Sequence, residues 1–404
     1  MSKGENMKTR LMTLAGGAAA LSLILSACGG SGSEGGGSSD EYKVIVLGGI
    51  GGEGVLADNA STSVISAQAG VEFVNKNGGI DGRDVTIKVI DDTGDPTVAV
   101  TKLREAINSD KPDLVLNSGP STVADATLPI LKQNNILSFN IGPTQTSGDP
   151  KQFPLNFDLS PSAGDQIAAY LPYFEEQGYK TVGVIHGSSS YGEVFAKSSE
   201  EIFSEGGLKV TANEEYDIAA LDMSAQLAAI RDTNPDVLVL DAYGAPLGYV
   251  LKGLEKLGWD VPVIGNTSVS ATGIISTEPP SGVLGTDVVK NLVMQTYKST
   301  KFDEADTKVN EAVKTMKGIG AIKATLILAY NYDALPLVAA AAEKAGSTDA
   351  KKLAEALEDP SVHEAADTAI LKKYNFTAEE HAPNPDASEF AFIAPSKLAD
   401  GQFQ

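Results

Sequence analysis

Apolar and polar positions along residues 42–264 follow two different periods. Short apolar runs, such as KVIVL at 43–47 and DVLVL at 236–240, predict buried β-strands. The stretches between these runs place apolar residues at helical spacing and predict amphipathic helices. In the first half the predicted strands are 43–47, 85–91, 113–116 and 136–141, and the predicted helices are 64–77, 98–109 and 123–133.

A second series of the same kind begins near residue 160. It combines helices at 165–177, 193–206, 225–233 and 247–257 with strands at 181–186, 208–212, 236–240 and 261–264. Repeated β-α-β units predict a parallel sheet with helices on both faces. The sequence therefore predicts an α/β protein made of two doubly wound halves.

The last third has a different pattern. Residues 324–345 predict one long Ala-rich helix and residues 350–357 a short helix, while 369–374 and 390–393 have the character of strands. A segment of this size must pack on the two earlier halves, and we expect it to cross back between them.

The N-terminus has the pattern of a secretory signal. Residues 7–28 read MKTRLMTLAGGAAALSLILSAC, with basic residues before an apolar stretch that is too short to span a membrane comfortably. Small residues directly before Cys28 are typical of a bacterial lipobox, so we expect a signal peptide at 1–27 and lipidation of Cys28. The alternative is a plain secretory signal with an incidental cysteine. Residues 28–41 are rich in Gly and Ser and predict a flexible tether.

Composition excludes several classes of function. The 404 residues carry 31 basic and 53 acidic side chains, a net charge of −22, which disfavours nucleic acid as a partner. A single cysteine rules out a disulfide within the chain, and the three histidines do not have metal-ligand spacing. The glycines of GGIGGEG at 48–54 match a dinucleotide fingerprint poorly. We therefore expect no metal and no cofactor.

One loop raises a specific question about binding. Residues 116–126 read LNSGPSTVADA, so a buried strand runs into small hydroxyl residues directly before a helix. In a parallel sheet, ligands collect beyond the carboxyl ends of the strands, where helix N-termini favour anions. Ser121 and Thr122 would then help to bind a carboxylate without any Lys or Arg. The alternative is that Ser121 only caps the helix.

Several stretches together resemble one protein family. NKNGGIDGRDVTIKVIDDTGDPTVAV at 75–100, FDLSPSAGDQ at 157–166, HGSSSYGEVFAKS at 186–198 and AYNYDALPLVAAAAEKAGS at 329–347 are similar, in order, to type I periplasmic binding proteins of the branched-chain amino-acid-binding branch. The resemblance covers nearly all of residues 42–395.

This resemblance implies a fold and a division into lobes. It implies two doubly wound parallel-sheet lobes, joined by three crossover segments, with a ligand cleft between them. We expect lobe 1 to comprise residues 42–160 and 290–365, and lobe 2 to comprise residues 161–289 and 366–404.

The resemblance also implies roles for individual residues in lobe 1. Family members place a carboxylate-binding hydroxyl where Ser121 falls. They offer a backbone carbonyl and then a Thr hydroxyl at the positions of Gly142 and Thr144. A Gly/Pro/Thr turn without a ligand would explain the second stretch equally well from its residues alone.

From lobe 2, Tyr191 resembles an aromatic residue that closes over the ligand in the family, although a Tyr here could equally pack at a helix start. Tyr243 follows a strand end and is expected to face the cleft. Amino-acid binders of the family carry an acidic residue near the position of Thr267, and this sequence has no carboxylate there. An ammonium group would have to be met by Asp241 or by carbonyls.

These features predict a solute-binding lipoprotein on the outer face of the cell membrane, anchored by Cys28. As the resemblance implies, it would deliver a small amino acid, or a related carboxylate or amide, to an ABC permease, and we expect it to be a monomer. One alternative is a ligand-sensing module for a receptor. Another is a secreted hydrolase using His186 and a serine of 188–190, although the sequence has no GxSxG motif.

Overall fold

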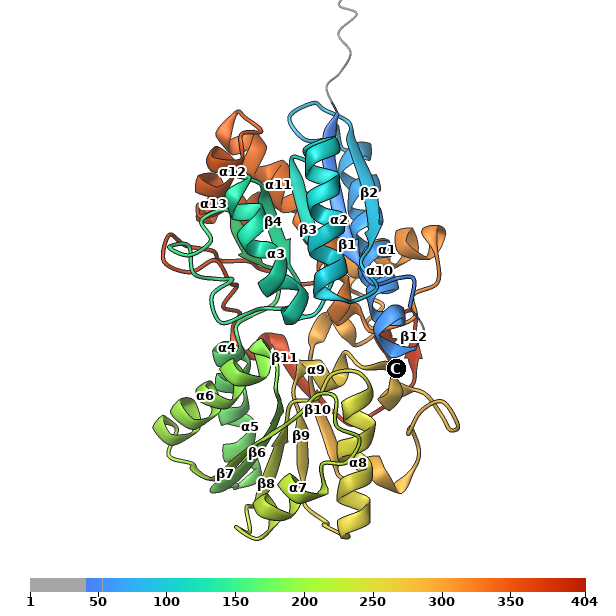
Figure 1. Ribbon diagram of the computed structural model, residues 1–404, viewed down its shortest axis with the longest axis vertical. Coiled ribbons are helices and arrows are strands. Elements are labelled where there is room, and N and C mark those ends of the chain that lie inside the picture. Colours follow the sequence, from blue (N-terminus) through green and yellow to red (C-terminus); the bar gives the residue numbers. More distant parts are fainter. Residues whose placement is uncertain (1–40, 53) are drawn as a thin grey trace, which may run out of the picture. The chain divides into compact units, whose positions relative to one another are not determined.

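A parallel five-stranded sheet forms the first lobe in the computed structural model, which describes residues 41–52 and 54–404 (Figure 1). Its strands lie in the order β2-β1-β3-β4-β5. The elements are β1 Tyr42–Gly48, α1 Val55–Lys76, β2 Val85–Asp91, α2 Pro96–Ser109, β3 Leu114–Asn117, α3 Ser121–Gln133, β4 Leu137–Asn140 and β5 Asn156–Asp158. The predicted signal peptide, Cys28 and all but the last residue of the predicted tether lie outside the described residues.

A six-stranded sheet forms the second lobe, in the order β11-β10-β9-β8-β6-β7. Only the β10–β11 pair is antiparallel. Its elements are α4 Ala163–Ala168, α5 Tyr170–Gln177, β6 Thr181–Gly187, α6 Ser190–Glu205, β7 Lys209–Tyr216, α7 Ser224–Arg231, β8 Val237–Leu240, α8 Ala245–Leu257, β9 Val263–Gly265, α9 Thr267–Ser270, β10 Leu292–Tyr297 and β11 Phe390–Ile393. Both sheets lie within one compact unit.

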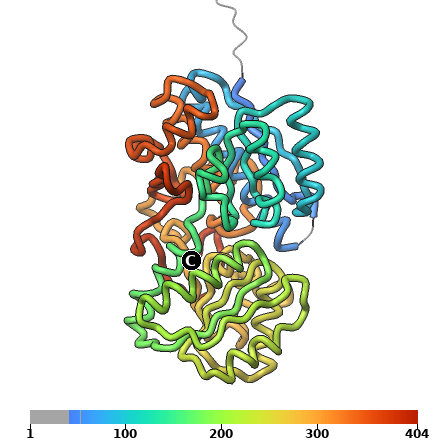
Figure 2. The backbone as a smooth tube through the Cα atoms, turned by 60° about the vertical axis from the view of Figure 1, so that its left-hand side comes forward, coloured from blue at the N-terminus to red at the C-terminus, as the bar shows by residue number. Residues whose placement is uncertain are grey.

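The last third of the chain returns to the first lobe before it re-enters the second. It contains α10 Thr307–Ile319, α11 Asn331–Ala345, α12 Ala350–Leu357 and α13 Pro360–Ala365, the short hairpin β12 Leu398–Ala399 and β13 Gln402–Phe403, and five 3₁₀ turns at 273–276, 287–289, 298–300, 326–329 and 387–389. Helices α10 and α11 pack on α1. The backbone therefore passes between the sheets after β5, after β10 and before β11 (Figure 2).

The observed sheets move two of the expected lobe boundaries. Strand β10, at 292–297, belongs to the second sheet, although residues 290–365 were expected in lobe 1. Residues 369–376 contribute Ile370, Leu371 and Phe376 to the hydrophobic core of the first lobe, although 366–404 were expected in lobe 2. Each boundary was placed too early because sequence patterns do not reveal which sheet a crossing segment joins.

Two element predictions in this third are wrong. The expected helix at 324–345 is interrupted: a 3₁₀ turn, Leu326–Ala329, precedes α11, and the N–H of Leu326 bonds to the carbonyl of Gly401 instead of to its own helix. The expected strand at 369–374 does not form. Its N–H groups bind the buried carboxylate of Asp333 on α11 rather than a neighbouring strand; the donors are Ala369, Ile370 and Leu371, together with the hydroxyl of Tyr374.

Helix α1 begins well before the predicted start at residue 64. Its first turns carry Asn59, Thr62 and Ser63, polar residues that are buried rather than exposed. The hydroxyl of Thr62 accepts hydrogen bonds from the N–H groups of 323 and 324, so it is satisfied by the returning chain. Polar residues that face the interior break the apolar periodicity on which the prediction rests. Among the described residues, no helix combines the length and apolar character needed to cross a bilayer.

A buried carboxylate sits where the chain leaves the first sheet. Asp158 ends β5 and is 1% exposed. Its oxygens accept hydrogen bonds from Ser147 Oγ at 2.6 Å and Asn140 Nδ2 at 3.3 Å. Burial raises the pKa of Asp158 to about 7, an effect that nearby Glu380 reinforces and these hydrogen bonds oppose.

Replacing Asp158 with Asn is therefore expected to change how stability depends on pH. Between the ordinary Asp pKa of 3.8 and about 7, the native protein holds a proton here that the unfolded chain releases. The parent protein should thus lose stability, relative to Asp158→Asn, as pH rises through this range. Each pKa unit corresponds to about 1.4 kcal/mol, so the relative loss amounts to a few kcal/mol. Urea unfolding of both proteins from pH 4 to 8 measures it, and parallel pH profiles would contradict it.

Candidate functional site

A cavity of about 340 Å³ lies at the carboxyl ends of the strands and is lined by residues of both lobes. The first lobe contributes the loops that follow β3 and β4. The second contributes the starts of α6 and α9 and the residues that follow β8. This is the position at which open α/β sheets bind ligands, because loops rather than side-chain layers fill the space beyond the strand ends.

Ser121 and Thr122 line the cavity at the N-terminus of α3. Pro120 is the N-cap residue, and no side chain caps this helix. Ser121 is instead the first helical residue, and its Oγ accepts the N–H of Tyr191 at 3.4 Å. Simple capping by Ser121 is therefore not what the structure shows. The first N–H groups of a helix have no intrahelical partner and carry partial positive charge, so this end of the cavity favours an anion.

Buried amides hold the loop before α3 in place. Asn117 Oδ1 accepts the N–H of Gly119 at 2.9 Å, and Asn331 Nδ2 donates to Ser118 Oγ at 2.7 Å. Gly142, which also lines the cavity, packs so closely against this loop that a Cβ would lie 2.9 Å from the backbone nitrogen of Ser121. The loops after β3 and β4 thus form one tightly packed wall.

Thr144 was predicted to bind the ligand through its hydroxyl, but it does not line the cavity. Its Oγ1 accepts the N–H groups of Thr146 and Ser147 at 3.3 and 3.1 Å, and its own N–H donates to Ser147 Oγ. The hydroxyl therefore stabilises its own turn. A Thr hydroxyl that follows a strand can either bind a ligand or stabilise its own turn, and the sequence does not distinguish these two roles.

Tyr191 and Thr267, both predicted site residues, line the cavity from the second lobe and meet at Gln166. The amide oxygen of Gln166 accepts hydrogen bonds from Tyr191 OH at 3.3 Å and from Thr267 Oγ1. Gln166 Nε2 donates to the carbonyl of Pro161 at 2.9 Å. Sequence reasoning missed Gln166, and only its place at the end of the crossover stretch 157–166 could have pointed to it.

Tyr243, which follows β8, also lines the cavity. Burial raises the pKa of its hydroxyl to about 12, so the group stays neutral and able to donate a hydrogen bond. Leu56 and Ile218, two of the larger exposed apolar side chains, line the same cavity and provide an apolar surface.

Asp241 is the one carboxylate among the described residues that line the cavity, and no Lys or Arg accompanies it there. It follows β8 and is 5% exposed. Asn266 Nδ2 donates to its Oδ1 at 2.7 Å. Burial raises its pKa, whereas the hydrogen bonds from Asn266 and Ser268, and His186 nearby, lower it. A buried carboxylate that no Lys or Arg of the lining neutralises favours a ligand that brings a positive charge.

Direct contacts join the two lobes at the rim of this cavity. Gln145, in the loop after β4, donates from Nε2 to Glu193 Oε2 at 2.6 Å and from its backbone N–H to Ser190 Oγ at 3.3 Å. Together with the bond from Tyr191 N–H to Ser121, these contacts connect α6 to the first lobe. The wall that carries the α3 N-terminus is therefore held against the second lobe.

The arrangement needed for a serine hydrolase is not formed by His186. Its Nδ1 lies 3.3 Å from the carbonyl of its neighbour Gly187. The hydroxyls at 188, 189 and 190 accept hydrogen bonds from the N–H groups of Ile218, Gly192 and Gln145. Within residues 41–52 and 54–404, no hydrogen bond joins His186 to these serines, and no group of three or more His, Cys, Asp or Glu side chains has the arrangement of a metal site.

Comparisons with known proteins agree with this geometry. A family model described as periplasmic binding protein matches residues 45–391. A Pseudomonas aeruginosa protein named as leucine-, isoleucine-, valine-, threonine-, and alanine-binding is 24% identical over 358 residues, which cover 85% of this chain and 90% of that protein.

Solved structures show the same fold. A type 1 periplasmic binding protein from Bordetella pertussis Tohama I superposes with a TM-score of 0.72 at 20% identity, covering 89% of this chain and 98% of its own. A solute-binding protein of an ABC transporter from R. palustris, in complex with benzoate, gives a TM-score of 0.62 at 19% identity, covering 79% of this chain and 85% of its own.

Proposed function

Because this chain belongs to the periplasmic binding protein family, in the type I branch that includes the branched-chain amino-acid binders, we propose that it is the solute-binding lipoprotein of an ABC importer and captures a small amino acid or a related carboxylate. Proteins of this family are extracytoplasmic ligand binders without enzymatic activity. The two-lobed α/β fold expected from the sequence is confirmed.

The class of ligand is inferred from two parts of one cavity, one of which favours an anion and the other a cation. The N-terminus of α3 offers free N–H groups and the hydroxyls of Ser121 and Thr122, which suit a carboxylate. Asp241 offers a buried carboxylate to a cation. A molecule with a carboxylate and an ammonium group satisfies both sites. Asp241 thus supplies the carboxylate that amino-acid binders of the family carry near the position of Thr267.

The remaining walls suit a modest apolar body. Leu56, Ile218, Ala271, Ile327 and Leu328 line the cavity alongside the polar groups. A volume of about 340 Å³ is at the small end for ligand sites, which fits an amino acid better than a drug-sized molecule. Closure of the two lobes buries such a ligand, because only the closed state makes both sets of contacts.

A thermal-shift panel tests the proposal. Leucine, isoleucine, valine, threonine and alanine are compared with benzoate, the ligand of the R. palustris neighbour described above, and with 4-hydroxybenzoate, the ligand of a second R. palustris solute-binding protein of similar fold. A ligand that binds the folded protein raises the melting temperature by mass action. We expect at least one amino acid to raise it more than either benzoate. If only the benzoates raise it, the assignment to an amino acid is wrong.

Ser121→Ala is expected to weaken binding of the amino acid that the panel selects by about tenfold. The change removes a hydroxyl beside the α3 N-terminus, and hydrogen bonds to charged groups contribute about 1.5–3 kcal/mol. Calorimetry of both proteins measures the effect. Ser204→Ala, an exposed serine near the end of α6, is the control and should change affinity less than twofold. Equal losses in both variants would contradict a ligand contact at Ser121.

Cys28 is proposed as the membrane anchor, with residues 28–41 as the tether and residues 1–27 as the signal peptide. The support is the sequence pattern, because residues 1–40 precede the described part of the chain. Cys28→Ser is expected to move the protein from the membrane fraction to the soluble fraction, because no acyl chains would hold it there. Fractionation and mass spectrometry of the parent N-terminus check this. Release of the unaltered parent protein would contradict the anchor.

A further inference from the structure

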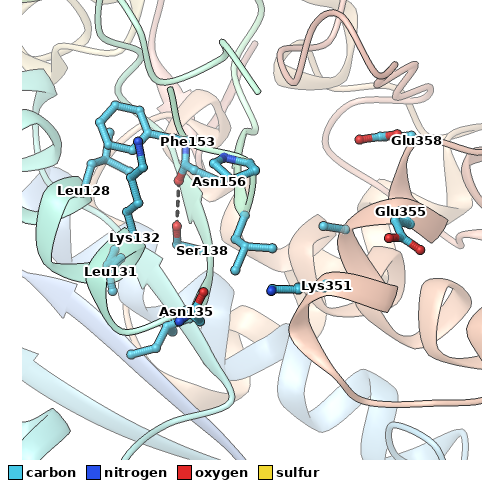
Figure 3. Close-up of a pocket in the computed structure, with 14 residues that line it drawn as sticks. Leu128, Leu131, Lys132, Asn135, Ser138, Phe153, Asn156, Lys351, Glu355 and Glu358 are labelled. Carbon is cyan, nitrogen blue, oxygen red and sulfur yellow. Dashed lines mark hydrogen bonds between the residues drawn. The ribbon is translucent and has the colours of Figure 1, made fainter. Parts of the chain in front are cut away.

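A second cavity, of about 460 Å³, lies in the first lobe and shares no lining residue with the first (Figure 3). Its walls are the C-terminal half of α3, the start of β4, the segment 153–156 and α12. Ser121 begins α3 in the inter-lobe cavity, whereas Lys132 lies near its other end. A 13-residue helix is roughly 20 Å long, so the two cavities lie at opposite ends of α3.

The floor of the second cavity is apolar. Leu128, Leu131 and Ile136 are each 1% exposed, and Leu155 and Ala354 are also buried. Protein interiors normally close such spaces, because every missing contact costs dispersion energy and apolar surface is left wet. A cavity of this size with an apolar floor has the dimensions of a ligand site rather than of a packing gap.

The rim of this cavity carries two lysines that are not engaged in ion pairs with any described residue. Lys132 and Lys351 line it from α3 and α12, and neither forms an ion pair within the described part of the chain. The ammonium of Lys132 lies over the Phe153 ring, 5.5 Å from its centroid. Figure 3 shows Lys351 reaching from α12 into the space beside Asn135. Two cations above an apolar floor suit an amphipathic anion.

The lining also carries two acidic side chains, Glu355 and Glu358. Glu358 is occupied, because its Oε1 lies 3.2 Å from His381 Nε2. In Figure 3 the carboxylates of Glu355 and Glu358 lie along α12 itself, whereas Lys351 extends away from that helix. The protein as a whole carries −22, so its general surface repels anions, and an anion that binds here needs this local pair of lysines.

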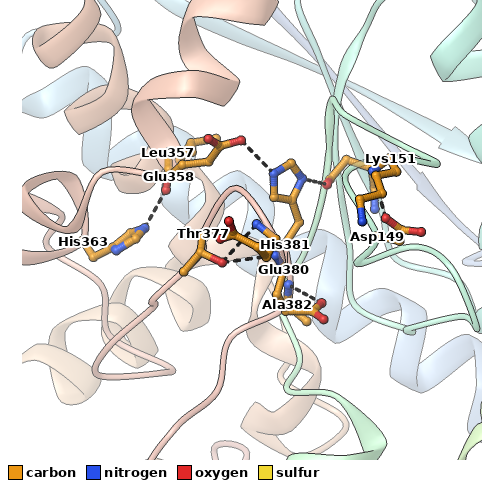
Figure 4. A network of polar contacts seen from close by, with 11 residues as sticks. Asp149, Lys151, Leu357, Glu358, His363, Thr377, Glu380, His381 and Ala382 are labelled. Carbon is orange, nitrogen blue, oxygen red and sulfur yellow. Dashed lines mark hydrogen bonds and ion pairs between the residues drawn. The ribbon is translucent and has the colours of Figure 1, made fainter.

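The buried imidazole of His381 links two walls of this cavity, the segment 153–156 and the end of α12 (Figure 4). His381 is fully buried and stacks on Phe157, with ring centroids 3.9 Å apart. Its Nδ1 lies 2.8 Å from the carbonyl of Asn156, and its Nε2 contacts Glu358 at the end of α12. Because Asn156 and Glu358 both line the cavity, this contact holds the cavity open at a set width.

We propose that this second cavity binds a small monocarboxylate with an apolar alkyl or aryl body. The apolar body occupies the floor between Leu128, Ile136 and Leu155, and the carboxylate meets the ammonium group of Lys351, with Lys132 adding a second positive charge farther along the rim. The site is separate from the amino-acid site, since no lining residue is common to both.

Octanoate is a suitable probe, titrated into the purified protein by calorimetry. We expect saturable binding that the double variant Lys132→Ala/Lys351→Ala weakens by at least about tenfold. The matched control, Lys151→Ala/Lys352→Ala, removes two exposed neighbouring lysines outside the cavity and should change the affinity less than about twofold. Octan-1-ol, which has the same body without the charge, should bind more weakly than octanoate.

Octanoate binding to two further variants shows which cavity it occupies. Ala354→Leu narrows the floor and should also reduce binding, while Ser121→Ala alters only the inter-lobe cavity and should leave octanoate binding unchanged. The lysine variants are at the surface, so the test stands even if Ala354→Leu fails to fold. The proposal is overturned by the absence of saturable binding, by equal losses in the two lysine pairs, or by loss on Ser121→Ala alone. The last result would place octanoate in the amino-acid site.

Discussion

Asp241→Ala is expected to weaken the binding of an amino acid such as leucine by about a hundredfold. Removing one partner of a buried charge pair costs about 2–5 kcal/mol, and 1.4 kcal/mol is a factor of ten in Kd. Asp241 is 5% exposed, and the described lining offers no other carboxylate to replace it. Calorimetric titration of leucine into both proteins measures the loss.

The deaminated analogue 4-methylpentanoate separates the ammonium contact from general damage. It retains the carboxylate and the apolar body of leucine, so the parent protein should bind it weakly, and Asp241→Ala should bind it at least as well as the parent. Glu215→Ala removes an exposed acid at the end of β7 and should leave leucine binding unchanged. Unchanged leucine affinity in Asp241→Ala would show that the ammonium group binds elsewhere.

Asp333→Ala is expected to destabilise the fold by about 3–5 kcal/mol. The buried carboxylate accepts the N–H groups of Ala369 and Leu371 at 2.7 and 2.8 Å and the hydroxyl of Tyr374 at 3.0 Å. Removing it leaves these donors buried and unpaired, which is among the costliest changes a single substitution makes. Burial raises the pKa of Asp333 to about 6, so the comparison belongs at pH 7.5 or above, where the group is ionised.

Urea unfolding gives the free energies for this comparison. Glu343→Ala, an exposed acid on the same helix α11, is the matched control and should change stability by less than about 0.5 kcal/mol. The ligand cavity should remain intact in the folded fraction of Asp333→Ala, because Asp333 does not line it. Similar stability of the two variants would show that the segment 369–374 is held by other contacts.

The parts of the fold that repeat a local pattern could be predicted from the sequence. Strands β1 and β8 follow the apolar runs 43–47 and 236–240 closely, because a buried parallel strand must be apolar along its length. Helix α12 occupies the predicted residues 350–357. In these segments the local preference and the tertiary environment agree.

The segments that could not be predicted depend on distant partners. Residues 369–371 give their N–H groups to Asp333, more than thirty residues earlier in the chain, so their apolar character indicated a strand that does not form. Polar residues at the start of α1 are satisfied by the chain that returns near 323. Neither partner can be identified from a local pattern.

The same limit applies to the candidate site. Ser121, Thr122, Gly142, Tyr191, Tyr243 and Thr267 line one cavity because each follows or begins an element at the carboxyl edge of a sheet, which the sequence indicates. Thr144 lies in the same kind of position, but Ser147 occupies its hydroxyl. Gln166 lies on α4, and its role depends on where that helix crosses the cavity.

A crystal structure with the amino acid that gives the largest thermal shift would show how the inter-lobe cavity holds its ligand. We expect the ligand carboxylate within about 3.2 Å of the first N–H groups of α3 and Ser121 Oγ, and its ammonium within the same distance of an Asp241 oxygen. A ligand bound outside the inter-lobe cavity, or one whose carboxylate points at Asp241, would contradict this expectation.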